Sequence, residues 1–484
     1  MSKKKVIVNY IYSSAYQLFL IIVPFITAPY LARVLTEDPV GINSYVSSIV
    51  QIFSLVGLLG LNSYSTREIA YVRDDNERMS KTLSELVILR MIFFVITTII
   101  YLLYASTSEY RIYFYIQIIS VMSAFIDISW FYGGIEEFKV TVFRSFVVKV
   151  FNISSIFLFI KSPDDLGLFM VISSIYALIG NILLYRGVKK RIGKFTFKDL
   201  HPARHIGPSI RLFLPQVASL IYLQVDKVMI GQLTDEISQV GFYDQAERIV
   251  KMPLALITAL SSVLLPRLSN EFRNNNTENV KRYVLSAMRF SLLFAIPLMF
   301  GLMAIAPTMI PWFLGDGYNG VIMIMVVLSP IVLFISISSV SGSQYLTAVN
   351  KTNVLTISYV VSALINLCIN YLLIPKFGAV GAAIGTVAAE FCACFYQLMS
   401  MRSVVSIRNL AKVSIKYIIS GVVMFAICTF VGQYFGIRIL STVLQIGIGI
   451  IIYFLVLFIL RDSFYLNTIK EGFTFIKHKF FRNK

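Results

Sequence analysis

Runs of about 20 apolar residues recur along almost the whole chain, and this pattern restricts what it can fold into. Of the 484 residues, 57% are hydrophobic and only 14% are charged, whereas a soluble domain averages about 25% charged residues. A water-soluble core of this length cannot bury so much apolar surface, so a lipid bilayer must be the solvent. The sequence therefore predicts an all-α polytopic membrane protein with about 14 transmembrane helices. These helices are expected at 8–32, 42–64, 84–105, 112–133, 141–160, 166–186, 211–233, 240–265, 284–309, 319–342, 353–374, 378–400, 413–433 and 438–460.

The basic residues between the predicted helices set the expected orientation. Loops on the side of the N-terminus carry about 32 Lys and Arg residues, and the opposite loops carry about five. Because positively charged loops stay in the cytoplasm, we expect a multi-pass protein of the cytoplasmic (inner) membrane with both termini in the cytoplasm. The basic residues of the opposite loops are Arg33, Arg111, Lys161, Lys376 and Arg438.

A basic stretch near the middle divides the predicted helices into two halves. When the chain is shifted by 200 residues, Val40-Gly41 falls on Val240-Gly241, and Arg67 falls on Arg267. Repeated halves with a site between them are a common plan among transporters. The expected domains are a six-helix bundle at 1–190, a basic cytoplasmic linker at 191–210, a second six-helix bundle at 211–402, and two extra helices with a basic tail at 403–484.

Charge and motifs exclude several classes of function. The net charge of +18 does not indicate nucleic-acid binding, because the basic residues occupy short breaks between apolar runs rather than a polar domain. The three histidines lie outside the apolar runs and no CxxC motif occurs, so no metal site is expected. No GxxxxGK motif followed by Ser or Thr occurs, so ATP hydrolysis is not supported. We expect no cofactor, and transport would use an H⁺ or Na⁺ gradient or the gradient of the substrate itself.

Ionisable residues inside the apolar runs are the strongest candidates for function, since each is costly in lipid and should face a cavity or a partner. Arg248 and Lys251 are three residues apart on one helix face, with Asp244 one turn earlier. Two cations on one face could hold a phosphate or an acidic sugar. The candidate headgroup-binding cations are Arg248, Lys251, Lys227, Arg90, Lys149, Arg289 and Arg33, and the candidate coupling acids are Asp127, Asp226 and Glu390.

Structural roles compete with these interpretations. Arg90, Lys149 and Arg289 lie within about two turns of the expected cytoplasmic ends of their helices, where they could instead reach lipid headgroups. Lys251 could form a structural pair with the acid one turn before it. Asp127 could pair with a neighbouring helix as readily as it could bind a proton.

Neutral polar side chains follow one face of two predicted helices. Such stripes could line a wet cavity that binds a hydroxyl-rich ligand, or they could hold helices together, and the sequence leaves both alternatives open. The first helix carries Tyr10, Ser13, Ser14 and Gln17, and the eleventh carries Ser358, Ser362, Asn366 and Asn370.

Several short strings resemble those of oligosaccharide-lipid flippases of the Wzx type. The most specific is 127–139 (DISWFYGGIEEFK), which is similar to the signature of the fourth helix in that family. It departs from the expected pattern at Tyr132-Gly133, where an aromatic residue is usually followed by Gln. The other strings are 29–33 (PYLAR), 65–70 (STREIA), 226–231 (DKVMIG), 240–248 (VGFYDQAER), 264–269 (LLPRLS) and 373–383 (LIPKFGAVGAA).

This resemblance implies the MOP exporter superfamily, in which two six-helix bundles form a V around a central cavity. It also implies the substrate, an oligosaccharide repeat unit on undecaprenyl pyrophosphate that is moved to the outer leaflet for capsule or surface polysaccharide assembly. The partners implied are this lipid-linked oligosaccharide, membrane lipids and the polysaccharide polymerase machinery. The two extra helices, about 413–460, would give the lipid tail a groove.

Three other functions compete with this one. A cation-coupled multidrug exporter of the same superfamily should rely on buried acids, but here intramembrane cations outnumber acids. A lipid II flippase is closer, because it shares the expected helix number and a basic lumen. A membrane glycan polymerase or acyltransferase would need a long outer loop or an intramembrane histidine, and the sequence predicts neither.

Overall fold

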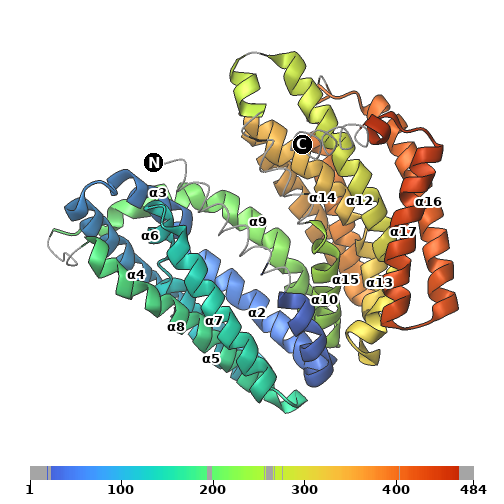
Figure 1. The fold of residues 1–484 in the computed structure, drawn as a ribbon. Helices are drawn as coiled ribbons and strands as arrows, with labels where there is room; N and C mark the ends of the chain where they lie inside the picture. Colours follow the sequence, from blue (N-terminus) through green and yellow to red (C-terminus); the bar gives the residue numbers. More distant parts are fainter. Residues whose placement is uncertain are drawn as a thin grey trace, which may run out of the picture. The chain divides into compact units, whose positions relative to one another are not determined.

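The computed structural model describes residues 19, 23–192, 199–254, 257, 265, 268–274, 276–402 and 404–467, with 214–223 and 407 described through their backbone alone. Throughout this part of the chain the regular structure is helical (Figure 1). Ten of its helical segments are long and apolar enough to cross a membrane, and a shorter apolar helix spans Val23–Leu35. The predicted class, an all-α polytopic membrane protein, is confirmed, whereas the number of about 14 spans stays a prediction.

The chain forms two compact units, Met1–Gly241 and Phe242–Lys484. The boundary falls inside α10 (Ser238–Lys251). Helix α9 (Ile206–Leu233) packs against helices of the first unit and belongs to it. The domain limits expected from the basic stretch and the repeat stay predictions.

The first unit is built from helices that follow one another closely along the chain. Helices α5, α7 and α8 run side by side in Figure 1, and α5 and α7 both pack against α8. The buried hydrophobic cluster of this unit lies among α3, α4, α6 and α8 and includes Leu83, Phe131 and Leu184. The helices are α2 (Glu37–Leu58), α3 (Leu61–Val72), α4 (Asn76–Thr107), α5 (Arg111–Ile126), α6 (Ser129–Gly134), α7 (Phe138–Phe159), α8 (Leu166–Ile192) and α9, with short 3-10 turns at Pro163–Asp165 and Pro202–His205.

Several helix limits of the first unit differ from the sequence expectation. The predicted helix 112–133 is interrupted at 127–128, where α5 has ended at Ile126 and α6 starts at Ser129. The predicted helix 42–64 is two helices, because Leu59 and Gly60 have left-handed φ values of 44° and 77° that end α2 and start α3. Helix α4 starts well before the predicted residue 84. The Asp75 carboxylate accepts hydrogen bonds from the backbone N–H groups of Glu77 and Arg78 and so caps it.

The second unit contains the longest helices. Helix α15 is bent where Gly378 adopts φ 56°, shortly after Pro375. Its two arms correspond to the predicted helices 353–374 and 378–400, so this break agrees with the sequence. The helices are α12 (Thr277–Phe313), α13 (Gly320–Leu328), α14 (Ile331–Ser338), a π-helical segment η4 (Ser339–Leu346), α15 (Thr352–Ser400), α16 (Ile407–Phe435) and α17 (Ile439–Ile459), with a 3-10 turn at Asp316–Tyr318.

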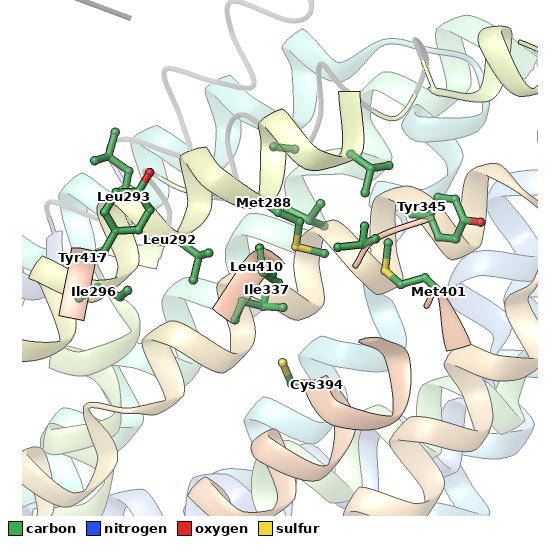
Figure 2. Packing of buried hydrophobic residues seen from close by; sticks show 14 of the residues in the cluster. Met288, Leu292, Leu293, Ile296, Ile337, Tyr345, Cys394, Met401, Leu410 and Tyr417 are labelled. Carbon is green, nitrogen blue, oxygen red and sulfur yellow. The ribbon is translucent and has the colours of Figure 1, made fainter. Parts of the chain in front are cut away.

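The core of the second unit lies among α12, α14, α15, α16 and α17. Figure 2 shows Met288, Leu292 and Ile296 of α12 in this cluster with Ile337 of α14 and Tyr417 of α16. Large aliphatic and aromatic side chains are at the same time exposed along the outer faces of the long helices. This arrangement is expected of helices whose outer faces contact lipid rather than water.

Candidate functional site

The segment 127–139 forms a compact turn in the first unit. The Asp127 carboxylate accepts hydrogen bonds from the backbone N–H of Ser129 (2.9 Å) and from its hydroxyl (2.7 Å). The indole N–H of Trp130 donates to the Asp127 carbonyl at 2.8 Å. These bonds hold the first residue of α6, Ser129, so the Asp127 carboxylate supports the start of this helix from one residue before its N-cap, Ile128.

Arg90 of α4 is fully buried beside this turn. Its guanidinium donates to the Asp127 carbonyl at 3.1 Å and to the side-chain oxygen of Asn62, and it lies 5.0 Å from the centre of the Trp130 ring. The structure therefore brings together the predicted cation Arg90 and the predicted acid Asp127. Through these contacts the Arg90 guanidinium on α4 connects α3 and α6 to its own helix.

The two other acids of this segment, Glu136 and Glu137, pair with basic residues elsewhere in the first unit. Arg191 of α8 donates from Nε to Glu137 at 2.8 Å, and Arg73 donates to Glu136 at 2.9 Å. The Arg191 guanidinium also lies 5.2 Å from the centre of the Tyr132 ring. Sequence reasoning missed these pairs, since each joins residues more than 50 positions apart.

Tyr132 replaces part of the family pattern with a different contact. Its hydroxyl donates to the Leu184 carbonyl of α8. A side chain at Gly133 would meet Thr66 only at an ordinary 3.5 Å, whereas a Cβ at Gly134 would lie 2.8 Å from the Thr66 carbonyl. The departure at Tyr132-Gly133 is thus accommodated by packing, and Gly134 is the glycine that the close approach of α3 requires.

Arg248 and Lys251 lie on α10, each beside an acid one turn earlier. Arg248 Nε is 2.8 Å from Asp244, and Lys251 Nζ is 2.5 Å from Glu247. Asp244 is buried, but 57% of the Arg248 side chain and 29% of the Lys251 side chain are exposed. Both cations are thus paired, and more than half of the Arg248 side chain stays exposed. Whether they bind a headgroup stays a prediction.

The remaining predicted cations occupy different environments. Lys227 is buried on α9, next to the buried Asp226, and both are engaged in interactions. Lys149 is half-buried on α7, and Arg33 is exposed in the helix Val23–Leu35. Arg289 is half-buried on α12 and interacts electrostatically with the Tyr417 hydroxyl of α16. Their binding roles stay predictions.

Of the predicted polar lining, Tyr10, Ser14 and Gln17 lie outside the described residues.

The polar stripe of the first arm of α15 faces the second arm. Ser358 accepts a hydrogen bond from Gln397 at 3.0 Å, and a Cβ at Gly385 would lie 2.1 Å from the Asn370 side-chain oxygen. Asn370 donates to Asn366 at 3.2 Å. The stripe therefore lies in a helix–helix contact, as expected for polar side chains that hold helices together.

The middle of this contact contains polar atoms without a protein partner. The Ser362 hydroxyl and the Asn366 side-chain NH₂ are buried and make no hydrogen bond to a described residue. Buried polar groups of this kind are commonly satisfied by water or an ion. Glu390 is buried on the second arm and has interactions of its own. This is the one place in the described chain where the predicted polar lining and a predicted coupling acid share a helix hairpin.

A further contact in the first unit joins two residues that the sequence repeat relates. A Cβ built on Gly41 of α2 would lie 2.2 Å from the Ile237 carbonyl, and one on Gly241 would lie 2.9 Å from the Gly41 backbone nitrogen. The starts of α2 and α10 therefore touch through backbone atoms. Only glycine fits at either position, because any side chain would overlap main-chain atoms.

Comparison with known proteins decides the family. A family model described as "Polysaccharide biosynthesis protein" matches residues 6–272, which is more than half of the chain. The chain belongs to this family. It is 23% identical over 404 residues to a proposed O-antigen transporter of Escherichia coli K12, a match that covers 82% of this chain and 96% of that protein. It is 24% identical over 238 residues, 48% of each chain, to a proposed low-salt glycan biosynthesis flippase of Haloferax volcanii.

Solved structures establish the fold of this polysaccharide biosynthesis protein. The lipid II flippase MurJ in an inward closed conformation matches with a TM-score of 0.76 and 20% identity, over 94% of this chain and 99% of that one. An inward-facing multidrug transporter of the MATE family, in the MOP superfamily, matches with a TM-score of 0.60 and 15% identity, over 81% and 99%. The predicted resemblance is confirmed: the family model and the O-antigen transporter relative agree with the expected family, and the solved structures agree with the expected fold.

This family member also contains a buried polar cluster that sequence reasoning missed. The Glu85 carboxylate of α4, fully buried, accepts hydrogen bonds from the His205 ring at 2.9 Å and from the His201 backbone N–H at 2.9 Å, and pairs with Arg204 at 2.6 Å. The other ring nitrogen of His205 lies 2.7 Å from the Tyr64 hydroxyl. Burial holds the pKa of His205 below its ordinary value, against the opposing effect of Glu85. The cluster fastens 201–205, part of the predicted linker, to the first unit.

Proposed function

We propose that this protein is a transporter that flips oligosaccharide repeat units linked to undecaprenyl pyrophosphate from the inner to the outer leaflet of the cytoplasmic membrane. The product would serve capsule or other surface polysaccharide assembly. The observation that carries the proposal is the match over most of both chains to a proposed O-antigen transporter, in a protein with the MurJ fold. The protein would catalyse no chemical reaction on its substrate.

The physical task explains why such a protein needs charge inside a membrane. A pyrophosphate that bears sugars is very costly to move through hydrocarbon, because it loses its hydration. A cationic and polar cavity replaces that hydration while the lipid tail stays in the bilayer. Alternating opening of the two bundles would then expose the headgroup to each side of the membrane in turn.

Arg248 and Lys251 are the proposed centre of headgroup binding. Arg248 donates from Nε to Asp244, and its guanidinium carries two further NH₂ groups that could make a bidentate contact with a phosphate. The proposed set of binding cations also includes Lys227, Arg90, Lys149, Arg289 and Arg33. Among these, Arg90 is the least available, since its guanidinium already binds Asn62 and the Asp127 carbonyl.

We also propose an orientation, an energy source and partners. Both termini would lie in the cytoplasm, as the basic loops predict. An H⁺ or Na⁺ gradient would drive transport through Asp226 or Glu390, since the Asp127 carboxylate is occupied by its hydrogen bonds from Ser129. The polymerase that consumes the flipped repeat unit is the expected functional partner.

Deletion of the gene, followed by location of the lipid-linked repeat unit, tests the function. We expect the repeat unit to accumulate on the cytoplasmic leaflet, with surface polymer lost. Complementation with Arg248→Ala/Lys251→Ala should fail although the protein reaches the membrane at normal levels. Normal polymer in the double variant would refute the headgroup role of these residues, and normal polymer in the deletion strain would refute the function.

A multidrug exporter and a lipid II flippase are the alternatives, because both folds are similar to this one. Drug sensitivity of the deletion strain without accumulation of a repeat unit would favour the exporter. Accumulation of lipid II with arrested cell-wall synthesis would favour the lipid II flippase.

A further inference from the structure

Helix α16 has one face that changes from basic to aliphatic along its length. Arg408, Lys412, Ile415, Ile419 and Val422 follow one another at spacings of four, three, four and three residues, so they lie on one helix face. All five are exposed, with 54% of Ile415, 45% of Ile419 and 47% of Val422 open to the surroundings. The opposite face, which includes Tyr417, Met424 and Cys428, is buried in the core of the second unit.

The depth of this face in a bilayer follows from helix geometry. Exposed Tyr434 and Phe435 end α16, and aromatic side chains of this kind gather at the membrane interface. At a rise of about 1.5 Å per residue, a hydrocarbon core of about 30 Å spans about 20 residues. Counted back from Tyr434, the hydrocarbon therefore begins near residue 414. Lys412 and Arg408 then lie at the depth of lipid headgroups, and Ile415 is the first side chain at the depth of the tails.

No described acidic residue neutralises the charges of Arg408 and Lys412, so both can bind an anion. Arg408 and Lys412 have no ion-pair partner among the described residues, and α16 and α17 contain no acidic residue. The nearby Asp462 is buried, where its carboxylate accepts hydrogen bonds from the Tyr465 backbone N–H (2.9 Å) and the Tyr417 hydroxyl (3.4 Å).

Lys416, one turn after Lys412, is basic for a different reason. Its ammonium group donates to the carbonyls of Leu460 (3.0 Å) and Arg461 (3.3 Å), which follow the last residue of α17. Lys416 therefore caps the end of its neighbour helix. Arg408 and Lys412 make no such contact with a described residue, so packing between α16 and α17 does not explain why these two positions are basic.

We propose that this face of α16 is a binding site for an anionic glycerophospholipid of the surrounding bilayer. Arg408 and Lys412 bind its headgroup phosphate, and Ile415, Ile419 and Val422 contact its acyl chain. The charge of the headgroup and the apolar tail match the two halves of the face in the order in which they occur along the helix. A zwitterionic lipid would bind more weakly, since its own ammonium group offsets the attraction.

Native mass spectrometry of the purified full-length protein tests this site, with phosphatidylglycerol and phosphatidylcholine as probes. The wild type should bind phosphatidylglycerol more tightly than phosphatidylcholine. Arg408→Gln/Lys412→Gln should weaken phosphatidylglycerol binding about 30-fold, on the basis of about 1 kcal/mol per basic side chain near a membrane surface.

The matched control is Lys281→Gln/Arg282→Gln. It removes one Lys and one Arg, both exposed, from α12 of the same unit. Equal weakening by the control would show that only net charge matters and would overturn the site. Equal binding of the two lipids by the wild type would also overturn it.

A third probe, a polyprenyl phosphate, distinguishes the occupants. If the Arg408→Gln/Lys412→Gln variant loses polyprenyl phosphate binding but keeps phosphatidylglycerol binding, then the face serves the carrier lipid and the proposal is wrong. Thermal unfolding of each variant checks that it is folded. The site is independent of the proposed flippase function, because the assay needs no transport.

Discussion

Gly41 and Gly241, which a 200-residue shift of the chain relates, lie against each other in the first unit: a Cβ on Gly241 would be 2.9 Å from the Gly41 backbone nitrogen. The repeat therefore has a physical consequence. Equivalent points of α2 and α10 meet at backbone distance, and the contact has no room for a side chain.

Gly41→Ala should disrupt this contact. Its Cβ would lie 2.2 Å from the Ile237 carbonyl, so the helices must separate, at a cost of about 1–3 kcal/mol. We expect reduced surface polymer in a complemented deletion strain, with the protein still present in the membrane. Gly207→Ala is the control, because nothing lies within 4 Å of a Cβ at Gly207. Full activity of Gly41→Ala would show that the contact is not needed for transport.

The buried Arg90 should be a stability residue. Arg90→Gln removes two hydrogen bonds from a charged group, each worth about 1.5–3 kcal/mol, and the contact with Trp130. We expect the free energy of unfolding to fall by about 3 kcal/mol, measured by thermal or denaturant unfolding in detergent. Arg78→Gln on the same helix should change it by less than about 1 kcal/mol, because 80% of the Arg78 side chain is exposed. Unchanged stability of Arg90→Gln with loss of transport would instead support the headgroup role.

These contacts mark the limit of sequence reasoning. Apolar runs predicted the helical class and the two arms of α15, expected at 353–374 and 378–400. The pairing of Arg248 with Asp244 was also within reach, since it follows from a spacing of four residues. Arg90 and Asp127 are 37 residues apart, and Glu85 and His205 are 120 apart. No local period encodes such pairs, and lipid-facing helices that are apolar on most sides do not reveal which face turns inward.

A gradient experiment should distinguish the role of Glu390 from that of Asp127. If Glu390 carries the coupling ion, Glu390→Gln should remove the dependence of transport on an H⁺ or Na⁺ gradient in proteoliposomes. Asp127→Asn should keep that dependence and lose about 1 kcal/mol of stability, because the acid supports the start of α6. Gradient dependence that is lost in Asp127→Asn and kept in Glu390→Gln would reverse the assignment.

His205 should make stability depend on pH. Burial lowers its pKa below the ordinary value of about 6.5, so the folded protein binds fewer protons at this ring than the unfolded chain does. The contribution favours folding above pH 6.5 and is lost as the pH falls from there through the lower pKa of the folded state. The midpoint of thermal unfolding should therefore decrease as the pH is lowered from about 7 to about 5.5.

His205→Gln should lower the midpoint at pH 7.5, because it disturbs the contacts with Glu85 and Tyr64. It should also make the midpoint depend less on pH. His201→Gln should keep the wild-type slope, because among the described residues the exposed His201 side chain bonds to the nearby Asp199 carbonyl and not to Glu85. An identical slope in His205→Gln would place the pH dependence in other groups.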